Sequence, residues 1–471
     1  MDITINTGVI MFEKQIYVER RKKLIEQLQS GVILLLGNDE SPMNYTDNPF
    51  HFRQDSTFLY YFGLDYPGLA AVIDVDAGKE IVFGNELTID DIVWMGNQPT
   101  LKDRSLSVGV DQTAPTNMLH DVLRQEKNKN RKIHFLPPYR PENSIKIFNL
   151  LDIHPLKINE SVSVELIKAV VEQRALKSQE EIDELDRAVS ISADMHITAM
   201  KMAKPGKTEL EITAAVQEVA VKAGGQLAFP IIATVNGETL HNHYHGNTLK
   251  SGDMFLLDAG AETSLHYAGD LSSTVPVDPT FTEKQKVIFN IALSAHQAAV
   301  KMLKPGIKFK DVHLTACRTI GEGLREIGLM KGDINEAVNE GAHAMFFPCG
   351  TGHMMGIDVH DMEDLGEVYV GYEGQPKSTL FGLKSLRLAR ELKPGFVITV
   401  EPGIYFIPQL IDSWKAENKF EDFINYEELE KYRDFGGLRN EEDFLITENG
   451  ARLLGKYIPT TVEEIEEIKN Q

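Results

Sequence analysis

The sequence predicts an α+β protein in which a smaller N-terminal α/β domain precedes a larger part built from two related halves. The segment LKSGDMFLLDAG at 249–260 is matched by LKPGFVITVEPG at 392–403, and AMKMAKPGKTELEI at 199–212 is matched by AVKMLKPGIKFKDV at 299–312. Chance similarity between Lys-Pro-Gly turns is the alternative, but both matches occur in the same order. Two long, irregular copies do not make a solenoid, so we expect two pseudo-symmetric halves that share one core.

The length of the chain and the pattern of its first part predict the domain organisation. At 471 residues the chain exceeds what a single core usually supports, so we expect domains over residues 1–170 and 171–471. An amphipathic helical run starts at Tyr17. Short apolar runs that are typical of strands follow it: GVILLLG at 31–37, LAAVIDV at 69–75 and KIHFL at 132–136. This alternation predicts a small α/β domain.

Helix start signals recur through the second part of the chain. Ser178, Thr208 and Thr282 are each followed three residues later by Glu or Gln, which is the signature of a capping box. The first of these signals opens a helical run that continues through Met202. The charged and aromatic stretch at 406–436 interrupts the strand pattern, and we interpret it as a surface excursion.

Composition excludes several classes of function. The formal net charge of −22 repels nucleic acid phosphates, and no cluster of Lys and Arg with interleaved aromatics offsets it. The apolar run at 31–37 is far shorter than the roughly 20 residues that span a bilayer, so no membrane segment is expected. The two cysteines, Cys317 and Cys349, require no disulfide framework. The first ten residues lack the basic and apolar segments of a secretory signal, so we expect a cytoplasmic protein.

Two acids occupy a predicted hairpin. Asp258 ends the apolar run MFLLDAG, and Asp270 follows a short polar connection in YAGDLSSTV. Adjacent strands would bring these two carboxylates face to face. Burial and mutual repulsion would then be costly unless a cation or a shared proton compensated for the charge.

Three further polar residues extend this pattern to a metal site. His353 stands beside glycines, and Glu401 and Glu441 lie on strand-like runs. Each acid alone is more typical of a solvated or capping group, so the prediction rests on the whole set. Four carboxylates and a neutral imidazole balance two divalent cations in formal charge. This oxygen-rich set favours hard or borderline ions, Mn²⁺ first, with Co²⁺ and Zn²⁺ as alternatives.

At these positions the sequence resembles a known enzyme family. The motifs DAG, YAGD, GHMMGIDVHD, TVEPGIYF and LRNEEDFLIT resemble the metal-dependent proline peptidases of the pita-bread fold, which include prolidase and Xaa-Pro aminopeptidase. The stretch FRQDSTFLYYFGLDYPGLAAVIDVDAGK, from Phe52, looks like the companion domain of the proline-specific members. The resemblance covers nearly the whole chain. It implies a C-terminal pita-bread catalytic domain, of the creatinase/aminopeptidase-like type, behind an N-terminal α/β domain.

The resemblance also implies a set of metal ligands. Asp270 and Glu441 would bridge both ions, whose combined charge would activate a water molecule and polarise the scissile carbonyl. The presence of every ligand argues against a metal-free, creatinase-like enzyme and against a catalytically inactive, protein-binding member of the fold. The implied ligands are Asp258, Asp270, His353, Glu401 and Glu441.

Catalytic and substrate-binding roles follow from the same resemblance. Glu401 would accept the proton of the water, His360 would support the tetrahedral intermediate, and His241 would lie on the substrate side. Arg439 corresponds to an arginine near the active site. Cys349 stands where many family members carry another histidine.

His241, His243 and His245 alternate along the chain, so they would share one face of an extended segment. A separate zinc site is therefore an alternative, although no cysteine or fourth ligand lies nearby in the sequence. We favour a role for His243 and His245 as polar surface groups or as supports of the site.

The expected substrate depends on Arg387. It falls where prolidases place an arginine for the carboxylate of a C-terminal proline, and its alternative is a solvated arginine. The insertion after Tyr405 and Trp94 also resemble prolidase, in which the tryptophan approaches a neighbouring subunit's site. We therefore expect a metallo-exopeptidase acting on Xaa-Pro dipeptides, with an Xaa-Pro aminopeptidase of longer peptides as the alternative. The family implies a homodimer or a larger homo-oligomer.

Overall fold

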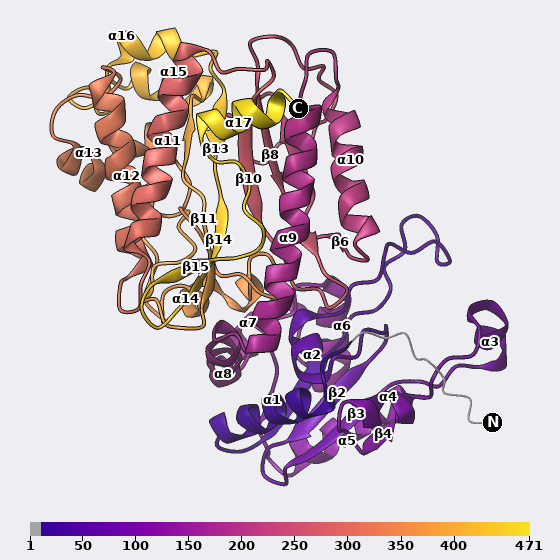
Figure 1. Cartoon of the computed structure of the whole chain (residues 1–471). Helices are drawn as coiled ribbons and strands as arrows, with labels where there is room; N and C mark the ends of the chain where they lie inside the picture. The colour runs from indigo at the N-terminus through magenta and orange to yellow at the C-terminus, as the bar shows by residue number, and fades with distance from the viewer. Residues whose placement is uncertain (1–10) are drawn as a thin grey trace. The chain divides into compact units, whose positions relative to one another are not determined.

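The computed structural model describes residues 11–471, and Figure 1 traces the chain from its N-terminal to its C-terminal element. The expectation about a secretory signal concerns the first ten residues and lies outside the described part. The chain divides into two compact units, one up to Arg174 with Asp364–Gly366 and one of Ala175–Glu363 with Glu367–Gln471. The expected domain limits, 1–170 and 171–471, stay a prediction.

The N-terminal unit contains a mixed five-stranded sheet in the order β4–β3–β2–β1–β5. Strands β1 and β2 pair antiparallel, as do β2 and β3, whereas β1 pairs parallel with β5 and β3 with β4. The predicted strands are therefore present. Their bounds are β1 Val32–Leu36, β2 Ala70–Asp74, β3 Lys79–Phe83, β4 Gln112–Ala114 and β5 Ile133–His134.

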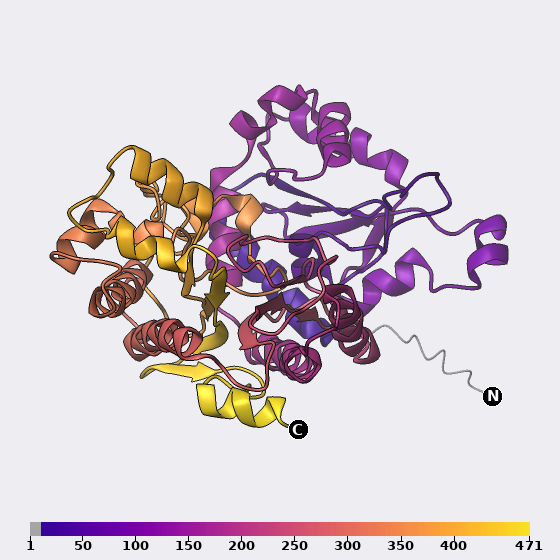
Figure 2. The ribbon, with the colours of Figure 1, turned by 90° about the horizontal axis from the view of Figure 1, so that it is seen from above.

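Helices lie on both sides of this sheet (Figure 2). Val32 and Leu34 of β1 and Val72 of β2 point to one face because side chains alternate along a strand. They pack with Leu119 and Leu123 of α5, and this cluster forms the core of the unit. The helices of the first part are α1 Lys14–Gln27, α2 Ser56–Phe62, α3 Ile89–Met95, α4 Leu101–Ser107, α5 Leu119–Asn128, α6 Pro141–Leu151, α7 Ile158–Ser161 and α8 Val164–Ala175.

The larger unit begins with α9 (Gln179–Met202), and three of its long helices start at the predicted capping signals. The backbone N–H of Ser178 donates to the Glu181 carboxylate at 3.1 Å, and Thr208 and Thr282 form complete capping boxes. These contacts satisfy backbone groups that the first turn leaves unpaired. Within residues 11–471, none of the helices combines the length and the apolar character needed to cross a bilayer. The other long helices are α10 Glu209–Lys222, α11 Glu283–Met302 and α12 Phe309–Glu326.

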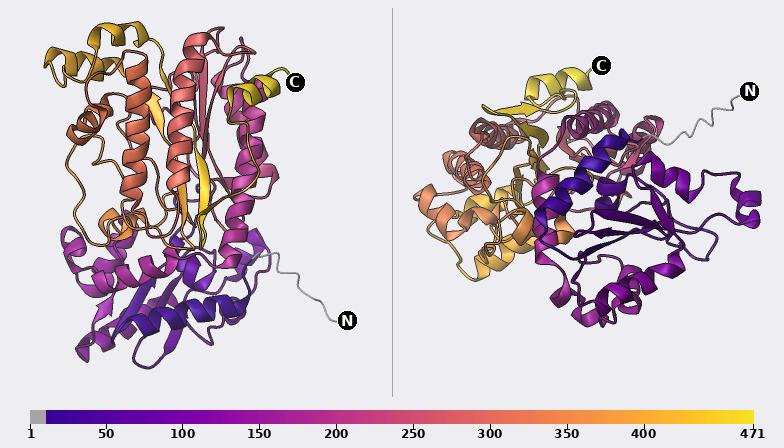
Figure 3. Two further views of the ribbon diagram at one scale, coloured as in Figure 1. Left: turned by 60° about the vertical axis from the view of Figure 1, so that its left-hand side comes forward. Right: turned by 90° about the horizontal axis from the view of Figure 1, so that it is seen from below.

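Two helix pairs and two small sheets form the related halves of this unit. Helix α9 packs on α10, and α11 packs on α12, as Figure 3 shows for the second pair. One sheet has the order β10–β8–β7 and the other β11–β14–β15. An isolated bridge between Ser272 and Glu441 joins them. The strands are β7 Ile232–Thr234, β8 Met254–Ala259, β10 Leu271–Pro276, β11 Val397–Val400, β14 Glu442–Ile446 and β15 Ala451–Leu453.

Shorter elements complete this unit. Two further antiparallel pairs, β6 with β9 and β12 with β13, flank the main strands. The bounds are β6 Gln226–Leu227, β9 Ala261–Glu262, β12 Gly403–Tyr405, β13 Gly437–Arg439, α13 Ile334–Glu340, α14 Glu367–Val370, α15 Pro408–Ala416, α16 Tyr426–Leu429 and α17 Val462–Lys469.

The repeat includes a pair of histidines that the sequence reasoning missed. His196 on α9 and His296 on α11 precede the two Lys-Pro-Gly breaks by the same spacing. Burial lowers the pKa of each imidazole to about 4. The ring of His196 contacts Ser273 Oγ at 2.7 Å and the Ala259 carbonyl at 3.0 Å, so a neutral imidazole ties its helix to strands β8 and β10.

The stretch 406–436, interpreted as a surface excursion, is mostly exposed or half-buried, but part of it packs into the core. The segment contains α15 and α16 and buries Ile411, Trp414 and Leu429. Trp414 packs edge-on against Phe420, with ring centroids 5.3 Å apart. The apolar residues of the segment are scattered among charged ones without a helical or strand period, so the sequence pattern does not predict that they pack together.

The repeat provides a matched test of helix capping. Thr208 caps α10, whereas Lys308 precedes α12 without a side-chain cap. Replacing Thr208 by Ala should lower the free energy of unfolding by about 1 kcal/mol, because the backbone N–H of Glu211 loses the Thr208 hydroxyl as its acceptor. The Lys308→Ala control should change it far less, as measured by urea unfolding. Equal losses in both variants would contradict this assignment.

Candidate metal centre

Strands β8 and β10 bring the first two acids together. Asp258 lies in β8, and Asp270 immediately precedes β10. These strands are antiparallel, with Ser272 paired to Asp258, so Asp270 is two residues out of register with Asp258. The two carboxylates are therefore diagonal neighbours rather than directly opposed, and both are buried.

The second half of the unit supplies two more acids. Glu401 follows β11, and its backbone N–H donates to the Thr351 carbonyl at 2.8 Å. Glu441 lies between β13 and β14, and its N–H donates to the Ser272 carbonyl at 3.0 Å. The Ser272 hydroxyl also donates to the Glu441 carboxylate at 2.6 Å. Glu441 is thus fixed by a residue of the first half.

His353 approaches these acids from a loop. Its backbone N–H donates to Thr399 Oγ1 at 3.1 Å, and its Nδ1 lies 3.0 Å from the Met354 carbonyl. These contacts leave Nε2 facing Asp270 Oδ2 at 3.3 Å and Glu401 Oε1 at 3.7 Å. An open ring nitrogen between two carboxylates is a suitable metal ligand.

The electrostatics of this cluster fit divalent cations. Ligand atoms of Asp270, His353 and Glu441 all lie within 4.8 Å of one another, and the buried Oδ1 of Asp270 has no hydrogen-bond partner. Burial, and then the charge of Asp258, raises the pKa of Asp270 well above its usual range. Burial, and then Asp270, does the same to the pKa of Glu441. Positive charge at this position would relieve the repulsion, and oxygen-rich ligation suits hard or borderline ions.

Arg439 supports one edge of the cluster. Its buried guanidinium pairs with Asp258, donates from Nε to Ser272 Oγ at 2.9 Å, and donates from Nη1 to the Tyr405 hydroxyl at 2.8 Å. This network orients Asp258 and leaves Arg439 with three protein partners.

The cluster opens into a pocket of about 210 Å³. The pocket has both apolar walls and convergent polar groups, as small-ligand sites usually do. All nine residues expected to bind metal or substrate line it: His241, Asp258, Asp270, His353, His360, Arg387, Glu401, Arg439 and Glu441.

His360 and Arg387 share one carboxylate partner in this pocket. His360 Nδ1 lies 2.6 Å from Glu363 Oε2, and Arg387 Nε donates to the same oxygen at 3.4 Å. The hydrogen bond from His360, aided by the charge of Arg387, lowers the pKa of Glu363 to about 2. The ring of His360 also lies against that of His353, with centroids 4.3 Å apart.

The alternating histidines do not converge. His241 and His243 line the pocket, whereas His245 Nε2 contacts the Ile231 carbonyl at 3.1 Å. Within residues 11–471, these three are not among the groups whose ligand atoms lie close enough for a metal ion, so the separate zinc site has no support. Burial lowers the pKa of His241, and it raises the pKa of the Cys349 thiol, which also lines the pocket, to about 12.

Three supporting residues were missed, although a simple signal marks them. Ser272, Thr399 and Asp443 each stand two residues from an expected ligand, and alternate residues of an extended chain share a face. Asp443 accepts a hydrogen bond from the backbone N–H of Asp270 at 3.0 Å. Alternation along an extended chain therefore marks both the expected ligands and the groups that hold them.

The fold and the acid cluster define a metal-dependent hydrolase, and comparisons identify the group to which it belongs. The model of metallopeptidase family M24 matches residues 183–448, and that of the aminopeptidase P N-terminal domain matches residues 17–134. The chain belongs to metallopeptidase family M24 and has the pita-bread fold of that family.

Similar proteins fall into two groups by name, Xaa-Pro dipeptidases and Xaa-Pro aminopeptidases. The chain is 33% identical to the human Xaa-Pro dipeptidase, over 96% of this chain and 92% of that protein. It is 30% identical to a probable Xaa-Pro aminopeptidase of Botryotinia fuckeliana, over 99% of each. The aminopeptidase PepP of Pseudomonas aeruginosa has a similar structure, with a TM-score of 0.80, 27% identity and coverage of 98% of this chain and 99% of that one. These matches support the predicted enzyme class without separating its two members.

The raised carboxyl pKa values predict an unusual pH dependence for the metal-free protein. Asp270 and Glu441 retain protons in the folded state that they lose in the unfolded state. Their contribution to the free energy of unfolding is therefore complete below the ordinary carboxyl pKa and is lost as pH rises to the raised values. Between the two pKa values, each retained proton should lower the free energy of unfolding by about 1.4 kcal/mol per pH unit.

Urea unfolding between pH 4 and 8 tests this expectation. The slope should be largest after chelation, smaller in the Glu441→Gln variant and nearly absent when Mn²⁺ is bound. A metal-free protein whose stability does not fall with pH would contradict the proposed burial of charge.

Proposed function

We propose that this chain is an Xaa-Pro dipeptidase that works with two divalent cations, Mn²⁺ by preference. This proposal rests on the position of Arg387, because its guanidinium group lines the same pocket as the acid cluster. A dipeptide ending in proline offers a carboxylate at a fixed distance from its scissile bond. Arginine suits such a carboxylate because its planar donors can bind both oxygens.

The proposed metal ligands are the residues predicted from the sequence. Asp258, Asp270, His353, Glu401 and Glu441 would hold the two ions. When bound, the ions would supply Lewis acidity toward a carbonyl and lower the pKa of a water molecule. Co²⁺ and Zn²⁺ are the alternative occupants, because their ligand preferences overlap with those of Mn²⁺.

The remaining polar groups can perform the proton and charge transfers of peptide hydrolysis. Glu401 lies closest to solvent among the acids and would accept the proton of the attacking water. The Glu363 carboxylate accepts a hydrogen bond from His360 Nδ1. His360 Nε2 is therefore left to donate to the carbonyl oxygen of the substrate as negative charge develops there. His241 would complete protonation of the proline nitrogen, which has no N–H of its own before cleavage.

We assign Arg439 a positioning role in addition to its place in the pocket wall. Each of its three guanidinium nitrogens already has a protein partner, in Asp258, Ser272 or Tyr405. The main role of Arg439 would therefore be to hold Asp258 in place, and the substrate contact expected from the family would be a minor one.

The alternative substrate is a longer peptide with proline at its second position. The similarity to aminopeptidase P structures favours it, whereas Arg387 favours dipeptides. A catalytically inactive, protein-binding role would require the five ligands to bind no metal. The family membership and the open Nε2 of His353 argue for the enzyme.

We also propose a homodimer in the cytoplasm. Helix α3 exposes four large apolar residues, among which Trp94 is 87% exposed, and such patches commonly mark interaction sites. Both cysteines are free thiols, which is usual in a reducing compartment.

Metal removal and a peptide panel test this function. Chelation should abolish hydrolysis of Ala-Pro and Gly-Pro, and Mn²⁺ should restore it. Activity that survives thorough metal stripping would overturn the metal mechanism. The dipeptides should be cleaved faster than Ala-Pro-Xaa tripeptides, and the reverse order would establish the aminopeptidase alternative.

Replacing Arg387 by Ala tests how dipeptides are recognised. Loss of a charge-assisted contact of about 2 kcal/mol should lower kcat/KM for Gly-Pro roughly 30-fold, mainly through KM. Cleavage of tripeptides should change much less, because their proline carries no carboxylate. The Lys384→Ala variant is the control, since Lys384 lies on the same segment but does not line the pocket. An unchanged KM for dipeptides would remove this role from Arg387.

A further inference from the structure

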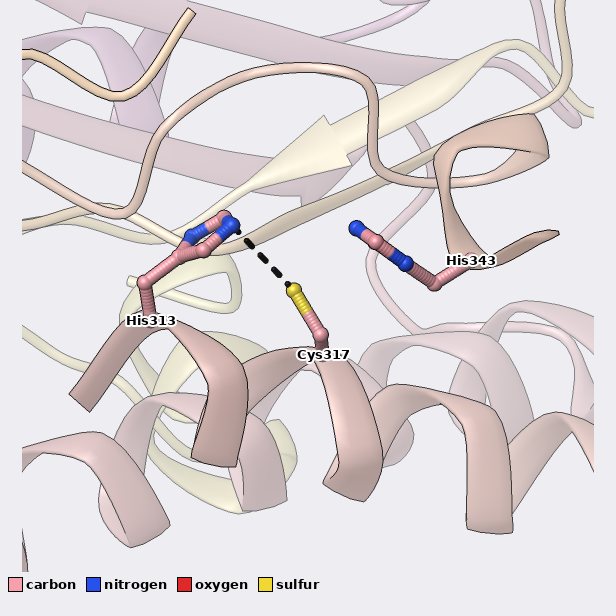
Figure 4. Close-up of side chains that lie close together, drawn as sticks. All are labelled: His313, Cys317 and His343. Carbon is pink, nitrogen blue, oxygen red and sulfur yellow. Dashed lines mark hydrogen bonds between the residues drawn. The ribbon is translucent and has the colours of Figure 1, made fainter. Parts of the chain in front are cut away.

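A second cluster of metal-binding side chains lies outside the pocket. His313 and Cys317 project from adjacent turns of α12, and His343 projects toward them from the short 3₁₀ turn Ala342–Met345 (Figure 4). Each offers a nitrogen or sulfur atom, and these atoms lie within 4.8 Å of one another. All three side chains are at most 1% exposed.

The geometry of this cluster matches the dimensions of zinc coordination. His313 Nε2 lies 3.5 Å from Cys317 Sγ. A Zn–N bond of about 2.05 Å and a Zn–S bond of about 2.3 Å at a tetrahedral angle also place these atoms about 3.5 Å apart. His313 and Cys317 are four residues apart on a helix, so they face the same side.

The surroundings of the two imidazoles favour metal binding. His313 Nδ1 lies 2.8 Å from Thr351 Oγ1, and this contact fixes the ring with Nε2 toward the thiol. The carbonyl of Val338 lies near the ring of His343, but neither ring nitrogen meets it or any other group with hydrogen-bond geometry. A fully buried imidazole without a hydrogen bond is rare, because burying a polar group unpaired is costly. Burial lowers the pKa of His313 to about 3 and that of His343 to about 4, so both rings are neutral, as ligands must be.

We propose that Cys317, His313 and His343 bind one thiophilic cation of the Zn²⁺ class, separate from the ions of the carboxylate cluster. A thiolate with two imidazoles suits zinc, whereas Mn²⁺ prefers oxygen ligands. Binding replaces the S–H proton of Cys317 with the metal ion and releases that proton to solvent, and the ion supplies the charge that the buried thiolate needs. The ion would link α12 to the turn that carries His343.

This site would also adjoin the proposed active centre. Thr351, which holds His313 through its hydroxyl, accepts a hydrogen bond from the backbone N–H of Glu401 through its carbonyl. The thiophilic ion would therefore stabilise the backbone next to Glu401 without contacting substrate.

The two cysteines of the sequence allow a clean spectroscopic test. Co²⁺ is added to the metal-free full-length protein, because thiolate-bound Co²⁺ absorbs in the near ultraviolet, whereas carboxylate and imidazole complexes do not. The native protein should show this band, saturating at one thiolate-bound ion per chain. The Cys317→Ser variant should lose the band and Cys349→Ser should keep it.

Several outcomes would overturn the proposal. If the native protein shows no band, the cluster is a hydrogen-bonded thiol and not a metal site. If the band is lost in Cys349→Ser but kept in Cys317→Ser, the thiolate ligand is Cys349 and not Cys317. A band that excess Zn²⁺ does not remove would overturn the assignment to zinc. Because this readout requires no hydrolysis, it is independent of the proposed peptidase activity.

A second variant keeps the test valid if Cys317→Ser does not fold. His343→Gln removes a ligand that makes no hydrogen bond, and it should weaken Co²⁺ binding at the thiolate by at least about tenfold. His120→Gln, at an exposed histidine of the N-terminal unit, is the matched control and should leave binding unchanged. Equal affinity in the His343→Gln and native proteins would overturn the three-ligand site.

Discussion

The mutual repulsion of four carboxylates in one buried site is the constraint on which the rest of the structure depends. Asp258, Asp270 and Glu441 are each less than a tenth exposed, and Glu401 lies beside them. Such a cluster persists only if its backbone is held rigidly and its charge is compensated. The strand ends provide the rigid backbone, Arg439 compensates one carboxylate, and the metal ions would compensate the others.

The internal repeat explains how one chain builds such a site. Each half contributes a helix pair and a strand that delivers an acid, so the site forms where the two halves meet. The equivalence is incomplete: Asp258 pairs with Arg439, whereas Glu401 faces the His353 ring. The buried histidines show the same pattern: both rings meet the backbone of a strand, Ala259 for His196 and Val400 for His296, but only that of His296 also lies 3.6 Å from a carboxylate, that of Glu442. The repeat thus provides the framework, and the differences between its halves provide the chemistry.

Much of this arrangement could be predicted from the sequence, because motifs and capping signals are local. The strand-end acids and the helices that begin after Thr208 and Thr282 depend on residues close to one another in the chain. The diagonal placement of Asp270 depends on pairing register, which no local pattern reports. Similarly, Glu363 joins His360 to Arg387 across a loop, and the scattered aromatics around Trp414 pack only after the chain has folded.

The bridge between Ser272 and Glu441 has a consequence for biosynthesis. The proposed ligands are spread from Asp258 to Glu441, so a growing chain exposes the first acids long before the last one has been made. Neither half contains all of the proposed ligands, so metal capture would follow the docking of both halves. Cofactor loading would then act as a checkpoint that only fully assembled molecules pass.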